Sequence, residues 1–304
     1  MGKLKLRPIL FFVLLSYGLA WLVALPLWLK GGLKNPLSLT ILIALMGIPA
    51  LAAAIVSKST DPGAKLIESL GLNPWKPVGR TLRFCLFAVL ASLAISLMAL
   101  VIGSAFGVYE FDLKHFSGLN EVLKIKFVGH EAALAKLPPL WVVSVLSVVS
   151  VFPGAVFNAL PALGEEIGWR GWLLPKLLPL GILPALVVSG VIWALWHTPL
   201  ILLGFNYPSV SGWLGLVCMT AMCISFGSVL AWLRLRSKSV WPAALGHGAF
   251  NATPGLSVVF GFAGQKIDPT QATVLGWTGW IFPALLAVVL FFFFPRQNGS
   301  TPKL

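Results

Sequence analysis

Residues 82–106 read LRFCLFAVLASLAISLMALVIGSAF, and Arg83 is the only charged residue in this stretch. A helix of about 20 apolar residues crosses a bilayer core about 30 Å thick. Lipid offers no hydrogen-bond partner to the backbone, so a spanning segment is either a helix or a strand of a closed barrel, and this run lacks the alternation of a barrel strand. The stretch therefore predicts a transmembrane helix.

Seven further runs of this kind occupy most of the chain. Hydrophobic residues make up 58% of the sequence, charged residues make up 10% and the mean hydropathy is +0.92, which excludes an ordinary soluble domain. The expected spans are residues 8–29, 37–57, 82–106, 140–162, 181–205, 211–233, 240–262 and 272–294. The fourth span could also continue to Leu177, before Pro179 and Gly181 stop it. We predict an all-α polytopic integral membrane protein, a bundle of about eight transmembrane helices.

Lys and Arg residues are distributed unevenly between the two sides of these spans. With the amino terminus in the cytoplasm, 15 of them fall on the cytoplasmic side and 7 on the other side. The positive-inside rule then predicts that both termini are cytoplasmic. The first apolar run is longer than that of a usual cleaved signal peptide, so we expect this span to remain as an anchor.

Residues 107–139 form the one sizeable segment outside the predicted spans. Apolar residues recur in it at helical spacing between charges, which predicts an amphipathic piece lying on the surface. These apolar residues are Leu119, Val122, Leu123 and Phe127. The sequence contains no internal repeat and no low-complexity linker. We therefore expect residues 1–304 to form a single membrane-embedded domain.

Several other classes of site are disfavoured by the sequence. The net charge of +13 comes from residues that flank the spans and match anionic lipid headgroups, so no nucleic-acid partner is expected. The three cysteines lie inside apolar runs, without the spacing of a zinc site or a disulfide framework. His130 and Glu131 resemble the start of a zinc-protease HExxH helix, but Leu134 stands where the second histidine is required.

Three apolar segments carry polar groups that a helix facing lipid does not keep. The first contains Glu165, Glu166 and Arg170. Glu166 and Arg170 are spaced i, i+4 and can pair on one helix face, while Glu165 points about 100° away. A carboxylate left free in a cavity of low polarity is suited to act as a general base. By itself, the motif is also compatible with an ordinary helix end at the membrane interface.

The second and third segments contribute imidazoles and an amide. His197 follows Trp193 by one helical turn, and His247 precedes Asn251 by one turn. Two neutral donors on one face suit a developing oxyanion. Each group also has a structural alternative: His197 or Thr198 could bond carbonyls freed by Pro199, and His247 with Asn251 could join helices.

Taken together, the three segments favour one shared site. At about 1.5 Å per residue, the depths of Glu165, His197 and His247 in their spans overlap within the error of the span boundaries. The structural alternatives given above would all have to hold, in three segments at once, if these residues had no shared function. We therefore expect these residues to share a cavity that opens to the cytoplasm.

The stretches EEIGWR, WALWH and HGAFN resemble, in order and placement, the three motifs of the CAAX prenyl endopeptidase and bacteriocin-processing family of intramembrane proteases. Those motifs are Glu-Glu-x-x-x-Arg, Phe-x-x-x-His and His-x-x-x-Asn, on helices four, five and seven of an eight-helix bundle. The resemblance covers about residues 140–262, the expected catalytic core. Trp193 stands where the family usually has phenylalanine, which puts the choice of substrate in doubt rather than the reaction.

The resemblance implies a role for each residue. Glu165 and His197 would activate a water, and His247 and Asn251 would stabilise the oxyanion of the tetrahedral intermediate. Glu166 and Arg170 would hold the acidic turn in place. Family members are often described as metalloproteases, and Glu165, His197 and His247 could in principle bind zinc. We favour a water activated without metal, hence no cofactor, because no HExxH helix fixes the ligand geometry.

The resemblance also limits the choice of substrate and location. It implies an endopeptidase that cuts near the end of an apolar or lipidated peptide, such as a CAAX-type prenylated or a bacteriocin-like one, in contact with membrane lipids. The sequence has no organelle address, so we expect a prokaryotic plasma membrane. A non-enzymatic immunity or scaffold protein stays open as an alternative. A transporter is disfavoured because the sequence shows no repeated halves.

Overall fold

The computed structural model describes residues 4–63, 65–73 and 78–294. Five helical segments in this part are long and apolar enough to cross a membrane. They are α1 (Leu6–Leu29), α2 (Ser38–Thr60), α4 (Val78–Ala105), the run Leu140–Leu180 and α12 (Gly212–Ser237). Extended pairing among the described residues is limited to one isolated bridge between Phe111 and Gly261. The chain is an all-α polytopic membrane protein, as the apolar runs predict.

The run Leu140–Leu180 contains the acidic turn. It consists of α7 (Leu140–Val149), α8 (Val151–Glu166), a π-helical turn η2 (Ile167–Leu173), α9 (Leu174–Leu177) and a short 3₁₀ turn η3 (Leu178–Leu180). The fourth span therefore continues past residue 162, which confirms the longer of its two predicted forms. Gly181 ends the run with a φ of 93°, a conformation that favours glycine. A π-helical turn inside an α-helix often marks a functional site.

Two predicted spans are shorter helices than the apolar pattern indicates. The fifth consists of α10 (Ile182–Trp196) and α11 (Thr198–Ile201), which are separated at His197. The seventh consists of α13 (Trp241–Asn251) and α14 (Leu256–Phe260), with Pro254 in the gap. Proline lacks the N–H that continues a helix, and this explains why apolar character outlasts the helix in both places. The eighth span is α15 (Trp277–Phe293).

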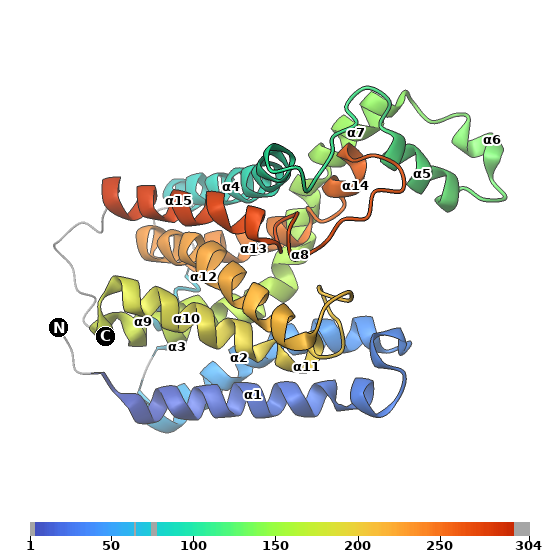
Figure 1. The fold of residues 1–304 in the computed structure, drawn as a ribbon. Coiled ribbons are helices and arrows are strands. Elements are labelled where there is room, and N and C mark those ends of the chain that lie inside the picture. The colour runs from blue at the N-terminus through green and yellow to red at the C-terminus, as the bar shows by residue number, and fades with distance from the viewer. Residues whose placement is uncertain (1–3, 64, 74–77, 295–304) are drawn as a thin grey trace.

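The core of the bundle is formed by α12 and α13. Figure 1 shows both helices in the middle, with α1 on one side and α4 and α15 on the other, while α8 crosses behind them. Helix α13 packs mainly against α8 and α4, and α12 packs mainly against α10 and α15. Because neighbouring helices surround α13, it can be much shorter than a helix that lipid must cover.

Glycines allow the closest of these helix contacts. A Cβ on Gly164 would lie 2.5 Å from the carbonyl oxygen of Met46, and one on Gly168 would lie 2.4 Å from Pro49. Glycine removes bulk where two backbones approach, so the acidic turn lies directly against α2. Gly171 similarly faces the carbonyl of Leu70. The three glycines therefore let the acidic turn pack closely against its neighbours.

The first helix belongs to the packed bundle. Phe12 is fully buried and stacks on Trp172 at a ring separation of 4.6 Å. The hydroxyl of Tyr17 donates to the carbonyl of Ile192, and the indole of Trp28 donates to the carbonyl of Pro199. These contacts give α1 a role in positioning the acidic turn and α10.

The segment 107–139 contains α5 (Ser117–Lys126) and α6 (Glu131–Leu134), so the predicted amphipathic helix is present. It contacts the α14 region: the Gly118 amide donates to the carbonyl of Gly261, and the Asp112 amide donates to the carbonyl of Phe260. Figure 1 shows α5, α6 and α14 at the end of the bundle opposite to the start of α1 and the end of α15. The segment thus covers one end of the molecule.

Candidate active site

Glu165 is the last residue but one of α8, and only 3% of its surface is exposed. Its Oε2 atom accepts a hydrogen bond of 2.7 Å from the indole of Trp193 and one of 3.2 Å from the indole of Trp169. Two neutral donors hold this oxygen. Among the described residues no hydrogen bond reaches Oε1. Glu165 is therefore an oriented carboxylate that keeps one oxygen available for a ligand.

Glu166 is fully buried and has different partners. Its Oε1 atom accepts a hydrogen bond of 2.9 Å from the guanidinium of Arg170 and another of 2.9 Å from Nδ1 of His247. The guanidinium carbon of Arg170 also lies 4.2 Å from the centre of the Trp193 ring. The predicted pair of Glu166 and Arg170 is confirmed, and it connects the acidic turn to α13.

His197 lies where α10 ends, and it is buried. Its Nδ1 lies 2.9 Å from the carbonyl oxygen of Trp193, and the hydroxyl of Thr198 bonds the carbonyl of Leu195. The structural alternative for these two residues is thus met, since both bond carbonyls near Pro199. A carbonyl oxygen only accepts hydrogen bonds, so Nδ1 carries the proton. Nε2 then has a free lone pair, and the same ring can accept a proton from water.

His247 and Asn251 come from α13. His247 is buried, whereas Asn251, the last residue of the helix, is exposed and makes no side-chain hydrogen bond within the described part of the chain. Glu166 is a carboxylate because Arg170 pairs with it, so His247 donates to it through Nδ1. A neutral His247 then has no proton on Nε2. With Nδ1 directed at Glu166, His247 donates through Nε2 only when both nitrogens are protonated.

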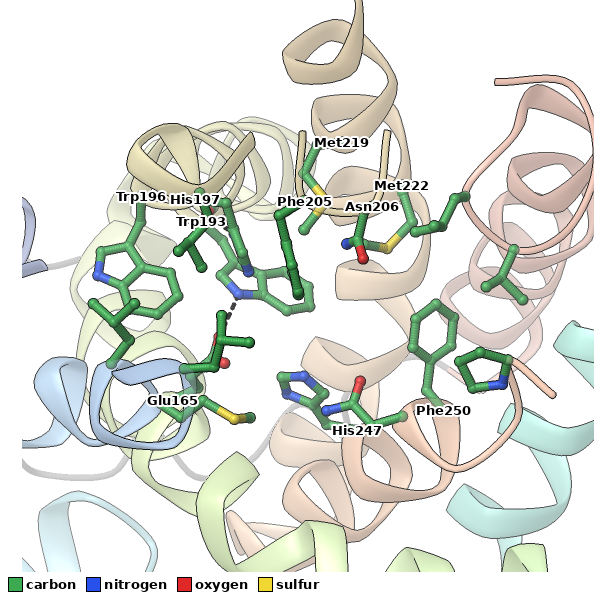
Figure 2. Close-up of a pocket in the computed structure, with 18 of the residues that line it drawn as sticks. Glu165, Trp193, Trp196, His197, Phe205, Asn206, Met219, Met222, His247 and Phe250 are labelled. Atoms are coloured by element: carbon green, nitrogen blue, oxygen red, sulfur yellow. Dashed lines mark hydrogen bonds between the residues drawn. The ribbon is translucent and has the colours of Figure 1, made fainter. Parts of the chain in front are cut away.

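Trp193 lies between the two imidazoles. Its ring centre is 6.1 Å from that of His197 and 5.4 Å from that of His247. Its N–H bonds Glu165 while its ring contacts Arg170, so it touches a residue of each motif. Figure 2 shows Glu165, His197 and His247 directed toward a common space beside Trp193. The structure thus brings the three motifs together.

That space is a cavity of about 470 Å³. Glu165, His197, His247 and Asn251 all line it, and its remaining walls are mostly apolar. Figure 2 shows Phe205, Met219, Met222 and Phe250 across from the polar groups. The cavity combines one carboxylate, two imidazoles and an amide with room for an apolar chain, the usual composition of a site that binds and orients a substrate.

The cavity does not lie toward the chain termini. Its lining includes residues 205–206 and 273–275, which are loops at the end where α10 and α13 stop. Helix α1 starts and α15 ends at the opposite end of the bundle (Figure 1). The cavity thus lies nearer to the end of the bundle opposite to the start of α1 and the end of α15, whereas the sequence analysis expects its opening and both termini on the same side. Sequence-based depth estimates measure distance along each helix but do not show which side of the site the loops leave open.

Two further residues at the site have no counterpart in the sequence analysis. Trp169 bonds Glu165 and is spaced i, i+4 from it, so the helical spacing that paired Glu166 with Arg170 could have identified it. Asn206 lines the cavity from a loop and has a φ of 64°. No periodic pattern marks Asn206, because its position depends on the path of a loop between two helices.

The donor set does not fit a zinc ion. Within the described residues, no group of three or more His, Cys, Asp or Glu side chains is placed to hold a metal. A zinc site needs three or four converging donors at about 2.0–2.3 Å. We therefore derive no step through a metal.

Comparisons with known proteins agree with this geometry. Residues 147–253 match the family model described as Type II CAAX prenyl endopeptidase Rce1-like, and this range contains all seven candidate site residues. CAAX prenyl protease 2 of Methanococcus maripaludis is 29% identical over 138 residues, which are 43% of this chain and 47% of that protein. The chain thus matches about half the length of this curated relative. Residues 147–253 are therefore similar to the CAAX prenyl endopeptidase and bacteriocin-processing family.

Proposed function

We propose that this chain is an intramembrane endopeptidase that hydrolyses a peptide bond near the end of an apolar or lipidated peptide. The observation that carries the proposal is the meeting of Glu165, His197, His247 and Asn251 in one cavity with largely apolar walls. The match of residues 147–253 to the family model supports the same reaction class. The relative from Methanococcus maripaludis is named a CAAX prenyl protease, which makes a prenylated peptide the first candidate substrate.

In the proposed reaction, Glu165 and His197 activate a water. Trp193 and Trp169 hold one carboxylate oxygen, and the other oxygen accepts a hydrogen bond from the water and orients it. The free Nε2 of His197 accepts the proton as the water oxygen attacks the scissile carbonyl carbon. General base catalysis of this kind contributes about 10²–10⁴-fold to the rate. His197 then returns the proton to the leaving amine.

Asn251 and His247 are placed to stabilise the negative oxygen of the tetrahedral intermediate. The Asn251 amide supplies a neutral N–H donor. His247 supplies a second donor through Nε2 in its doubly protonated form, in which Nδ1 still donates to the carboxylate of Glu166. A donor of this kind is typically worth about 2.7–4 kcal/mol in the transition state. In this scheme Glu166 and Arg170 fix the direction of His247.

The orientation in the membrane is also a proposal. We keep the assignment from the charge distribution, with both termini in the cytoplasm of a prokaryotic cell. The cavity then opens toward the extracytoplasmic side, where an exported or bacteriocin-like peptide can reach it. The opposite orientation would give access to a peptide prenylated in the cytoplasm. Topology therefore discriminates between the two substrate classes.

Glu165→Gln tests the reaction. The full chain in detergent is offered two quenched fluorescent peptides, one ending in a farnesylated CAAX sequence and one apolar without a lipid. We expect the wild-type chain to cleave at least one of them, and Glu165→Gln to lower kcat by about 10²–10⁴-fold at an unchanged melting temperature. Glu131→Gln, a surface carboxylate on α6, is the matched control.

Three results would contradict the proposal in different ways. Full activity of Glu165→Gln would show that Glu165 takes no part in activating the water. Loss of activity on chelation, restored by zinc, would contradict the metal-free route. A folded wild-type chain that cleaves neither peptide would favour the immunity or scaffold alternative.

Cysteine labelling tests the orientation. Lys124→Cys on α5 and Lys58→Cys near the end of α2 are exposed positions at opposite ends of the bundle. We expect a membrane-impermeant maleimide added to intact cells to label position 124 and to leave position 58 unlabelled. The reverse pattern would place the cavity on the cytoplasmic side and leave the proposed chemistry unchanged.

A further inference from the structure

A second cavity lies at the end of the bundle away from the candidate active site. Its volume is about 470 Å³, and it is formed where α4 begins and α12 ends. Six residues line it: Arg80, Arg83, Phe84, Phe87, Trp232 and Arg236. Three of these are arginines and three are aromatic, and the described residues that line the cavity include no carboxylate. Like charges that line one cavity repel each other unless an anion lies between them.

The arginines are held in place by local contacts. Arg80 donates to the backbone carbonyl of Arg236, and its guanidinium carbon lies 5.9 Å from the centre of the Phe84 ring. Nε of Arg83 donates to the carbonyl of Gly79, one turn back in its own helix. Neither Arg80 nor Arg83 forms an ion pair with a described residue. Both therefore keep positive charge and N–H donors for a ligand.

The aromatic residues form a wall deeper in the bundle. The Phe84 and Phe87 rings each lie 5.7 Å from the Trp232 ring, in tilted contact. The Trp232 indole donates to the carbonyl of Phe294, which fixes the ring. Phe84, Phe87 and Trp232 lie about one turn further into the apolar part of their helices than the arginines. The cavity thus has a cationic outer part and an apolar inner part.

The surrounding surface indicates the source of the anion. Leu82 and Leu86, on the same first turns of α4, are 62% and 56% exposed. A membrane helix exposes such residues to acyl chains, which places Arg80 and Arg83 at the level of the lipid headgroups. Guanidinium groups bind phosphate oxygens through paired N–H donors. The ligand chemistry is therefore that of a phosphate joined to an apolar chain.

We propose that this cavity binds the phosphate of an anionic membrane phospholipid, with an acyl chain against Phe84, Phe87 and Trp232. The site is separate from the peptidase cavity and does not depend on the proposed reaction. The bound lipid neutralises the arginine charges and joins the start of α4 to the end of α12. Binding at this position fixes how deep these two helices lie in the membrane.

Lipid retention tests the proposal. The full chain is reconstituted with phosphatidylcholine and phosphatidylglycerol, washed in detergent, and the lipid that remains bound is measured by native mass spectrometry. We expect the wild-type chain to retain phosphatidylglycerol in preference to phosphatidylcholine. Retention should be about five-fold weaker for Arg83→Gln and about thirty-fold weaker for Arg80→Gln/Arg83→Gln, from about 1 kcal/mol per basic residue at an anionic membrane surface. Lys58→Gln/Lys65→Gln removes two charges at the same end and should retain the lipid.

Equal retention by the wild-type chain and Arg83→Gln would overturn the proposal. The hydrogen bond of Arg83 stays within its own helix. Arg83→Gln therefore stays informative even if the double variant does not fold. A second arm adds inorganic phosphate to the lipid-free chain. If inorganic phosphate raises the melting temperature as much as phosphatidylglycerol does, and only with Arg80 and Arg83 present, the ligand is a free phosphate and the lipid assignment is wrong.

Discussion

Glu165 and Glu166 are neighbours in the sequence, but they lie in two different regions of the molecule. Glu165 lines the cavity and is held by two neutral indoles, whereas Glu166 is fully buried between Arg170 and His247. The rotation of about 100° between successive helix residues separates them. One carboxylate is available to a substrate, and the other is part of the framework. Chemical type alone does not distinguish catalytic from structural acids.

Arg170→Met gives the strongest test of the framework side. It leaves Glu166 buried with His247 as its remaining partner, and breaking a buried ion pair costs about 3–5 kcal/mol. We expect a loss of unfolding free energy of this size, measured by reversible unfolding in mixed micelles. Glu166→Gln/Arg170→Met should lie closer to the wild-type chain, because no buried charge is left unpaired. If Arg170→Met is as stable as the surface variant Lys58→Met, the ion pair does not hold the turn.

Gly248→Ala tests how the framework reaches the cavity. A Cβ there would lie 2.5 Å from both the carbonyl oxygen of Ala155 and the amide nitrogen of Ala159. Helix α13 must then move away from α8, and with it His247, next in the chain. We expect a loss of roughly 1–3 kcal/mol in stability and reduced peptide cleavage. Gly18→Ala in α1 meets no neighbour within 4 Å and is the control; equal effects would contradict the close-packing argument.

Trp193→Phe tests the cavity side. Phenylalanine keeps an aromatic ring near Arg170 but removes the 2.7 Å hydrogen bond to Glu165. The carboxylate keeps only the 3.2 Å bond from Trp169, so it is less well oriented toward the water. We expect kcat to fall about tenfold, the equivalent of about 1.4 kcal/mol, with little change in melting temperature. Trp169→Phe should have a smaller effect, and the opposite order would show that Trp193 does not orient Glu165.

Asp112 extends the comparison to a carboxylate outside the membrane. The Ser117 hydroxyl and the backbone amides of His115 and Ser117 lower the pKa of Asp112 from 3.8 to about 2. Because the folded-state pKa is lowered, these bonds stabilise the segment above pH 3.8 and lose this effect as the pH falls toward 2. We expect pepsin to cleave the wild-type chain near Leu113 increasingly as the pH falls from 4 to 2. Asp112→Asn should be cleaved there at both pH values. If Asp112→Asn is protected from pepsin at pH 4 as well as the wild-type chain is, the Asp112 hydrogen bonds do not stabilise this segment.

Much of the fold could be predicted because the bilayer imposes a simple rule. Segments long and apolar enough to span it become helices, and α1, α2, α4 and α12 match their predicted spans closely. The rule fails for α10 and α13, which end near Pro199 and Pro254 inside apolar runs. In both places backbone chemistry ends the helix before the apolar character ends.

The sequence by itself determined which polar residues a membrane helix would not keep and which of them share a helix face, because helical spacing is a local property. Only the tertiary structure decided that Glu165, His197, His247 and Asn251 meet in one cavity, and that Trp169 and Trp193 bond the same carboxylate oxygen. It also decided that the cavity lies away from the termini. Such facts depend on how helices pack and where loops run, and these are set by contacts between residues far apart in the chain.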